Sequence, residues 1–216
     1  MSSSESLALR EQFGNPENQR ETATVGMWIF LATEVMLFGA LFTGYAVYRM
    51  YYTQGFLEGS REMTLVIGTV NTAVLFTSCL TMSLAIRAIA EGRQYRTYIL
   101  LLVTAGIGLV FLALKFAEYY LHYEEHKVPG IWFESRSPQA GPEELFFIFY
   151  FVMTGLHAIH LSIAVGLVLV VAVRTAMGRF SAEYHTPIDM VGLFWHYIDI
   201  IWSFLYTIFY VTGFHK

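Results

Sequence analysis

The chain has 216 residues, of which 56% are hydrophobic, 17% aromatic and only 14% charged, and its mean hydropathy is +0.50. This composition excludes an ordinary soluble domain, in which charged residues make up about a quarter of the total. The formal net charge of −4 is small and the basic residues are scattered singly, so no nucleic-acid partner is expected. The single cysteine, Cys79, cannot form an intramolecular disulfide. We therefore expect a membrane protein.

Five stretches are long and apolar enough to cross a bilayer as helices, which takes roughly 20 residues. They lie at about residues 25–48, 63–87, 97–119, 145–174 and 188–214. Backbone groups inside lipid must be satisfied within one segment, so these spans are predicted to be helices rather than open strands. The predicted fold is all-α, a polytopic membrane protein with a five-helix transmembrane domain over residues 23–216. Residues 1–22 lack an apolar signal core and are predicted to form a polar tail.

Basic residues at the ends of the spans predict how the chain is oriented. More of them flank the spans on the side of the N-terminus, for example Arg87, Arg93 and Arg174. Fewer, such as Arg49 and Lys127, flank the opposite side. Because cytoplasmic loops carry the excess of lysine and arginine, the N-terminus and its tail are predicted to be cytoplasmic and the C-terminus external.

Ionisable residues inside the spans are the candidate functional residues, since each costs several kcal/mol at the bilayer centre unless it is paired or hydrated. They are Glu34, Lys115, Glu118, His157, His160, His196 and Asp199. A rise of about 1.5 Å per residue places Glu34, His160, His196 and Asp199 at similar depths, which predicts one shared polar layer. The same reckoning places Glu118 close to the outer surface. Lys115, within a turn of Glu118, is predicted to pair with it or to extend outwards.

The last span carries a polar or small residue at alternating intervals of three and four, which is the spacing of one helical face. These residues are Asp189, Gly192, His196, Asp199, Ser203, Tyr206 and Tyr210. The fourth span repeats the pattern with Thr154, His157 and His160. Lipid offers such faces no hydrogen-bond partner, so both are predicted to turn towards other protein.

Three interpretations of the polar layer remain open from the residues alone. It can be a structural hydrogen-bond network that fixes helix register. It can be a haem or metal site built from His157, His160 and His196, although a di-iron centre calls for Glu-x-x-His on two helices and this chain has His-x-x-His and His-x-x-Asp. It can also be a proton path, for which carboxylates and histidines are the usual groups.

Four segments carry a resemblance to a known family. "FYFVMTGLHAIHLSIAVG" (149–166) and "LFWHYIDIIWSFLYTIFY" (193–210) resemble the two signature helices of subunit III of the haem-copper oxidases. "WIFLATEVMLFGALF" (28–42) is similar to the family's glutamate-bearing helix. "LALKFAEYYLH" (112–122), with Glu118 and Tyr119, is similar to its outer helix-end motif. The four matches occur in the same order, and five spans correspond to the short bacterial form of the family.

The resemblance implies a non-catalytic subunit of a proton-pumping respiratory oxidase in the bacterial cytoplasmic membrane. This chain would carry no redox centre and no metal, since haem and copper belong to partner subunits. It would pack directly against subunit I, bind phospholipid and support proton uptake. Glu34 would be the membrane carboxylate of the lipid cleft, and Arg174 and His185 would lie near a lipid headgroup. His157, His160, His196 and Asp199 would be structural members of a polar network.

Within this family the resemblance favours the cytochrome c type over quinol oxidases and accessory proteins of nitric oxide reductases, because of the segment "HTPIDMVGLFWH" (185–196). The runner-up is a stand-alone haem or di-iron membrane oxidoreductase using His157, His160 and His196. A transporter is disfavoured, because the spans lack the Gly/Pro interruptions of broken helices and no internal repeat is evident.

Overall fold

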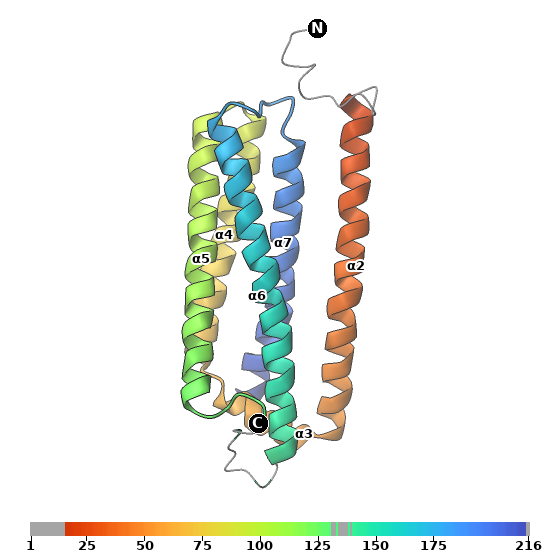
Figure 1. Cartoon of the computed structure of the whole chain (residues 1–216), viewed down its shortest axis with the longest axis vertical. Helices are drawn as coiled ribbons and strands as arrows, with labels where there is room; N and C mark the ends of the chain where they lie inside the picture. The colour runs from red at the N-terminus through yellow and green to blue at the C-terminus, as the bar shows by residue number, and fades with distance from the viewer. Residues whose placement is uncertain (1–15, 131–132, 134–137, 139, 215–216) are drawn as a thin grey trace.

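Five long helices run side by side along the long axis of the molecule (Figure 1), which confirms the predicted five-span, all-α fold. The computed structural model describes residues 16–130, 133, 138 and 140–214. The long helices are α2 (Pro16–Tyr51), α4 (Leu65–Ala90), α5 (Gln94–Glu124), α6 (Ala140–Ala176) and α7 (Thr186–Tyr206). The described chain begins at one end of this bundle and finishes at the other, as an odd number of spans requires.

Several helices extend further than their apolar stretches. α2 begins at Pro16, so the last seven residues of the predicted tail, 16–22, are helical, while residues 1–15 lie outside the described part. α6 begins at Ala140 and α5 continues to Glu124. Hydropathy marks the part of a helix that lies in hydrocarbon. The backbone hydrogen bonds of a helix continue through Glu, Gln and Arg, which are good helix formers.

A short helix, α3 (Thr53–Glu62), occupies the connection between the first two spans, where no helix is predicted from the sequence. Its Gly55, Phe56, Gly59 and Ser60 are buried. A Cβ atom on Gly59 would lie 2.5 Å from the Phe146 ring, so only glycine allows this close approach to α6. The spacing of these four residues, on one face of a helix, was the available signal.

The last span ends in irregular helix. After Tyr206 the chain forms a π-helical segment, η2 (Thr207–Val211), and a 3₁₀ turn, η3 (Thr212–Phe214). The Ser60 hydroxyl of α3 donates to the Phe209 carbonyl at 2.8 Å, which accounts for one backbone acceptor in this segment. The C-terminal end of the last span is thereby fastened to α3.

The polar stripe of α7 was predicted to turn towards other protein, and the structure shows that it faces α4. Gly192 lies against the side chains of Met82 and Ile86. The hydroxyls of Tyr206 and Thr69 are 2.7 Å apart. The indole nitrogens of Trp195 and Trp202 donate to Ser78 and Thr72 of α4 at 3.1 and 3.0 Å. These polar contacts between two spans fix the register of α7 on α4.

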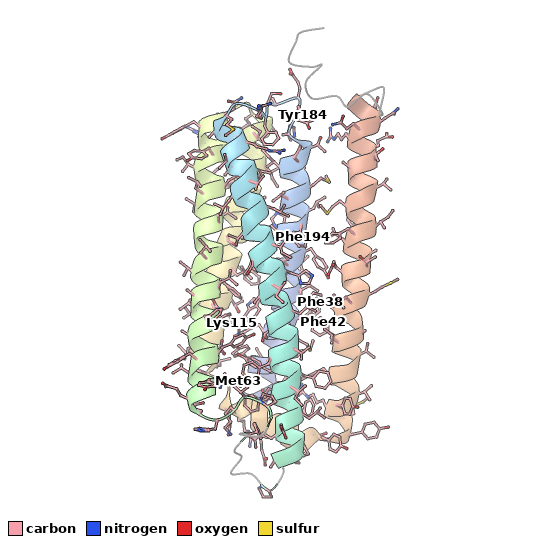
Figure 2. The ribbon with its side chains drawn as sticks, in the orientation of Figure 1. Phe38, Phe42, Met63, Lys115, Tyr184 and Phe194 are labelled. Atoms are coloured by element: carbon pink, nitrogen blue, oxygen red, sulfur yellow. The ribbon has the colours of Figure 1, made fainter. Side chains whose placement is uncertain are left out.

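α2 stands to one side of the other four long helices (Figure 1). Only 11% of its most apolar window is buried within the chain, against 61% for α7. Aromatic pairs bridge the space between α2 and the rest of the bundle, where Figure 2 shows Phe38, Phe42 and Phe194. Phe30 meets Phe194 and Phe42 meets Phe204, with ring centroids 5.5 and 5.9 Å apart. Most of the α2 surface is therefore left for lipid or another subunit.

Candidate functional site

Glu34 and His160 form a polar link between α2 and α6. The Nε2 atom of His160 is 2.8 Å from Glu34 Oε2, and both side chains are largely buried. His160 Nδ1 is 2.8 Å from the Leu156 carbonyl and must donate to it. One further proton then lies between Nε2 and the carboxylate, so the pair is electrically neutral overall whichever atom holds it. Neutrality makes the pair tolerable inside the hydrocarbon.

His196 and Asp199 do not share this link. They lie on the face of α7 that meets α4, where the Nδ1 atom of His196 is 3.2 Å from Cys79 Sγ. Asp199 is 3% exposed, and among the described residues its carboxylate faces no hydrogen-bond donor other than the Cys79 thiol. The ligand atoms of Cys79, His196 and Asp199 all lie within 4.8 Å of one another. The predicted polar layer is thus divided between two interfaces, α2 with α6 and α4 with α7.

Cys79 is a member of this cluster that is not among the candidate functional residues predicted from the sequence. It lies in the second span at a position that faces the polar stripe of α7. The available signal in the sequence was that Cys79 lies inside a membrane span. That signal is weak, because a cysteine in an apolar run also packs as a small hydrophobic residue. Only the register of α4 on α7 shows that its sulfur meets a histidine.

His157 lies in the aromatic core of the bundle. It is 1% exposed, and neither ring nitrogen has a hydrogen-bond partner within the described residues. Its ring centroid is 5.1 Å from that of Trp202 and 5.8 Å from that of Phe111. His157, His160 and His196 therefore contact three different sets of residues. This arrangement does not support the pair of facing histidines that bis-histidine haem ligation needs.

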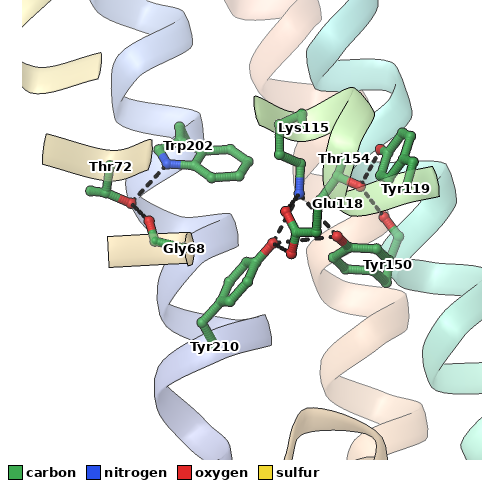
Figure 3. Close-up of polar contacts among 9 residues, drawn as sticks. All are labelled: Gly68, Thr72, Lys115, Glu118, Tyr119, Tyr150, Thr154, Trp202 and Tyr210. Atoms are coloured by element: carbon green, nitrogen blue, oxygen red, sulfur yellow. Dashed lines mark hydrogen bonds and ion pairs between the residues drawn. The ribbon is translucent and has the colours of Figure 1, made fainter. Parts of the chain in front are cut away.

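A charged cluster occupies the bundle interior between α5, α6 and the end of the last span (Figure 3). Lys115 Nζ donates to Glu118 Oε2 at 2.9 Å, to Tyr210 at 2.9 Å and to Tyr150 at 3.0 Å. Tyr210 in turn donates to the second oxygen of Glu118. The rings of Tyr150 and Trp202 lie 4.8 and 5.1 Å from the ammonium nitrogen, within cation–π range. Every polar atom of the ion pair is thus satisfied.

The predicted pairing of Lys115 with Glu118 is confirmed. The two residues are only 2% and 3% exposed, so Lys115 turns into the bundle and not away from it. α5 continues to Glu124, more than a turn past Glu118, and the depth of Glu118 near the outer surface stays a prediction. Tyr119, beside them, shares a 2.6 Å hydrogen bond with Thr154 of α6.

Arg174 and His185 lie at the end of the bundle where the described chain begins. Arg174 is exposed in the last turn of α6, where a positive charge complements the helix dipole. Nε2 of His185, the residue before α7, is 3.6 Å from Asp189 Oδ2. No ion pair joins Arg174 to another residue in the described ranges. Their predicted proximity to a lipid headgroup stays a prediction.

A groove of about 860 Å³ runs between α2 and α7, towards the end of the bundle opposite Arg174. Its walls are mainly apolar and aromatic, and they include Val35, Phe38, Phe42, Ile200, Phe204 and Ile208. Arg49 and Thr53 line it near the end of α2. An apolar groove with a cationic side chain at one end suits an amphiphile, with its chains inside the groove and its headgroup at Arg49.

Comparison with known proteins agrees with the resemblance in the sequence. The family described as "Cytochrome c oxidase subunit III" matches residues 15–214. The chain is 30% identical to cytochrome c oxidase subunit 3 of Thermostichus vulcanus, over 87% of this chain and 86% of the relative. It is 28% identical to cytochrome bo(3) ubiquinol oxidase subunit 3 of Pseudomonas aeruginosa, over 87% and 84%. It is also 28% identical to the probable quinol oxidase subunit 3 of Staphylococcus haemolyticus, over 88% of each chain.

Proposed function

The chain belongs to the cytochrome c oxidase subunit III family, and from this premise we propose that it stabilises subunit I, binds phospholipid and supports proton uptake in a respiratory haem-copper oxidase. The chemistry of oxygen reduction takes place on haem and copper in partner subunits. This chain itself contributes no redox centre to that reaction.

The observation that carries the proposal is the Glu34–His160 link beside the apolar groove. α2 has few buried contacts within the chain, so this neutral pair and the aromatic bridges hold it in place. The groove next to it accepts the acyl chains of a phospholipid, with Arg49 at the headgroup. At the other end of the bundle, Arg174 and His185 bind headgroups of the opposite leaflet. Ordered lipid in both leaflets of the membrane keeps α2 and the neighbouring surface of subunit I in one arrangement.

We place the N-terminus in the cytoplasm and the C-terminus outside, in the bacterial cytoplasmic membrane, on the distribution of basic residues at the span ends. Arg174 and His185 then lie at the cytoplasmic face, where protons enter subunit I. Arg49 and the adjoining groove lie in the external leaflet. Tagging either terminus and testing its accessibility to protease in sealed cells checks this orientation.

The proposed electron donor is cytochrome c, which the segment from His185 to His196 favours. Quinol is the second candidate, because two of the relatives described above are named as quinol oxidase subunits. Other subunits bind the electron donor, so the test uses the whole complex. The purified oxidase is expected to oxidise reduced cytochrome c, and oxidation of quinol alone would favour the second candidate.

One experiment tests the assignment as a whole. A tagged copy of the chain is purified in mild detergent from its own membranes, and the proteins that accompany it are identified by mass spectrometry. Subunit I, with its haem absorption, is expected in the preparation. After the complex is dissociated, the isolated chain is expected to show no Soret band. A Soret band that stays with the isolated chain would instead identify a stand-alone haem protein.

A further inference from the structure

Cys79, His196 and Asp199 bring three different metal-binding groups together between α4 and α7. A thiol, an imidazole nitrogen and a carboxylate oxygen lie within 4.8 Å of one another. In a tetrahedral zinc site with bonds of about 2.0 to 2.3 Å, neighbouring ligand atoms are about 3 to 4 Å apart. The 3.2 Å between Cys79 Sγ and His196 Nδ1 lies in that range.

The hydrogen bond at Nε2 of His196 shows which of its two ring nitrogens carries the proton. Ser83 Oγ donates its hydroxyl proton to the Cys79 carbonyl at 3.0 Å. The same oxygen lies 3.3 Å from His196 Nε2 and therefore accepts from that nitrogen. Nε2 thus carries the proton of the neutral imidazole, and Nδ1 presents its lone pair to the Cys79 sulfur. An outer hydrogen bond that fixes the tautomer in this way is typical of histidines that bind metals.

Asp199 supplies the second, independent observation. Its carboxylate is 3% exposed, belongs to the cluster, and has no hydrogen-bond partner among the described residues outside the cluster itself, where only the Cys79 thiol faces it. An unpaired carboxylate within a membrane-spanning helix costs several kcal/mol. The polar groups of the Lys115 cluster, in contrast, are all satisfied. The bare protein offers Asp199 only the weak donor of a thiol, whereas a cation would provide a charged partner.

We propose that Cys79, His196 and Asp199 bind a divalent transition-metal ion of the zinc type and thereby join α4 to α7. A thiolate and a carboxylate balance the two positive charges, and the imidazole is neutral, so the loaded site has no net charge within the membrane. The thiol releases its proton as the ion binds. The mixed sulfur, nitrogen and oxygen ligands favour Zn²⁺ over Mg²⁺, which prefers oxygen alone. One tetrahedral position remains for water or a group from a neighbouring subunit.

This proposal departs from the expectation, drawn from the family resemblance, that the chain holds no metal. It assigns no redox role to the ion, and it does not rest on the proposed role in the oxidase. Its failure would leave that role unchanged. Without an ion, the cluster is a thiol that hydrogen-bonds to Nδ1 of His196 or to the Asp199 carboxylate. The experiments below distinguish this thiol cluster from a metal site.

The first experiment measures zinc in the full chain, purified in detergent, equilibrated with Zn²⁺ and passed through gel filtration. We expect about one ion per chain in the wild type, since three protein ligands make a complete site with one open position. Cys79→Ser and Asp199→Asn are expected to lose the ion. Glu91→Gln, the same change of carboxylate to amide in the loop after α4, is expected to keep it. Zinc content that is equal in all four proteins, or absent from the wild type, would overturn the proposal.

The second experiment uses the single thiol of the chain and does not depend on how Cys79→Ser folds. Zn²⁺ is expected to slow the reaction of Cys79 with N-ethylmaleimide, a chelator to restore it, and Mg²⁺ to have no effect. Ser83→Ala removes only the outer hydrogen bond, so it is expected to weaken zinc protection by about 10- to 100-fold, and Asp199→Asn by more. Equal zinc protection in Asp199→Asn and the wild type would exclude the carboxylate as a ligand and overturn the assignment.

Discussion

Glu34 and His160 show how a single polar pair can position a helix that has little other support. Their contact joins α2 to α6 across the space that aromatic side chains otherwise fill. If one residue is replaced, the other loses its partner, and because it is largely buried, water cannot fully take the partner's place. The replacement therefore costs the free energy of desolvating the group that remains.

Glu34→Ala is expected to loosen α2 and to reduce both the lipid retained by the purified oxidase and the number of turnovers before inactivation. Glu34→Gln keeps a hydrogen-bonding side chain, so its loss should be smaller. Ser162→Ala, an exposed hydroxyl on α6 that bonds only to its own helix, is the control. Lipid phosphorus analysis and continuous oxygen-consumption assays measure the two effects. Unchanged lipid content and lifetime in Glu34→Ala would contradict the role proposed for this pair.

Lys115 and Glu118, in contrast to Glu34 and His160, form an ion pair that the bundle encloses completely. Removing one partner of a buried pair leaves an uncompensated charge and typically costs about 3–5 kcal/mol. Lys115→Met is therefore expected to destabilise the protein strongly. The double change Lys115→Met with Glu118→Leu removes both charges and is expected to recover much of the loss. Thermal unfolding in detergent compares the four proteins of this double-mutant cycle. A double variant less stable than both single variants would show that the pair itself is a large net stabiliser.

At the scale of the elements, close approach of helices decides where glycine is required. A Cβ atom on Gly108 of α5 would lie 2.8 Å from the Trp195 ring of α7 and 2.9 Å from Val165 of α6. Gly106, two residues earlier on the same helix, has no atom within 4 Å of such a position. The two glycines look alike in the sequence and differ only in the helix face they occupy.

Gly108→Ala is expected to destabilise the bundle by about 1–3 kcal/mol, because neither the indole nor Val165 can move without disturbing the core. Gly106→Ala is expected to be neutral or to stabilise by up to about 1 kcal/mol through helix propensity. Chemical unfolding of the two variants, prepared in parallel, provides the comparison. Equal stabilities would mean that α5 does not approach α6 and α7 as closely as described.

Lys127 lies outside the membrane-spanning segments and joins α3 to the first turn of α6. Its Nζ atom lies 2.7 Å from Glu62 of α3 and 3.0 Å from Glu143 of α6. Partial burial lowers the pKa of Lys127, but its hydrogen bonds and charge interactions with the two carboxylates outweigh this, so the net pKa lies above its ordinary value of 10.5. A raised pKa in the folded state means that the charged form stabilises the fold.

The stabilisation by Lys127 should be fully present below its unfolded pKa and be lost as the pH rises through the folded pKa. The wild type is therefore expected to be more stable than Lys127→Met by a constant margin from pH 7 to pH 9. That margin should fall only above about pH 10.5. Thermal midpoints of both proteins against pH measure it, and the difference cancels the other groups that titrate there. A margin that shrinks below pH 9 would contradict this interpretation.

The whole molecule consists of a packed set of four long helices and a fifth, α2, with a groove beside it. Ala46 is exposed on α2 and lines this groove, whereas Met36, on the same helix, is 75% exposed and does not line it. A large side chain at the first position fills space that the proposal assigns to lipid. A large side chain at the second position only projects from the bundle.

Ala46→Trp is therefore expected to lower the number of phospholipids retained by the purified complex, and Met36→Trp to leave it unchanged. Native mass spectrometry or phosphorus analysis counts the lipid. Loss of the same amount of lipid in both variants would point to a general effect of tryptophan on α2. No loss in Ala46→Trp would mean that the groove holds no tightly bound lipid.

Much of the architecture could be predicted from the sequence, for physical reasons that apply one segment at a time. Hydrocarbon must be crossed by about 20 apolar residues with internal hydrogen bonds, and this determines the number and type of the spans. Polar residues on one face must meet protein, and this determines that the stripe of α7 faces inwards. α3 could not be predicted in this way, because it lies outside hydrocarbon. Its burial depends on which other elements of the chain pack against it.

The sequence by itself determined five membrane helices, the position of Lys115 one turn from Glu118, and the polar face of the last span. All of these depend on spacing within one segment or on the chemistry of the bilayer. Only the tertiary structure decided that His160 meets Glu34, that His196 and Asp199 meet Cys79, and that His157 meets aromatic rings. Depth along a span can be counted from the sequence, but which helix lies opposite depends on the packing of all of them.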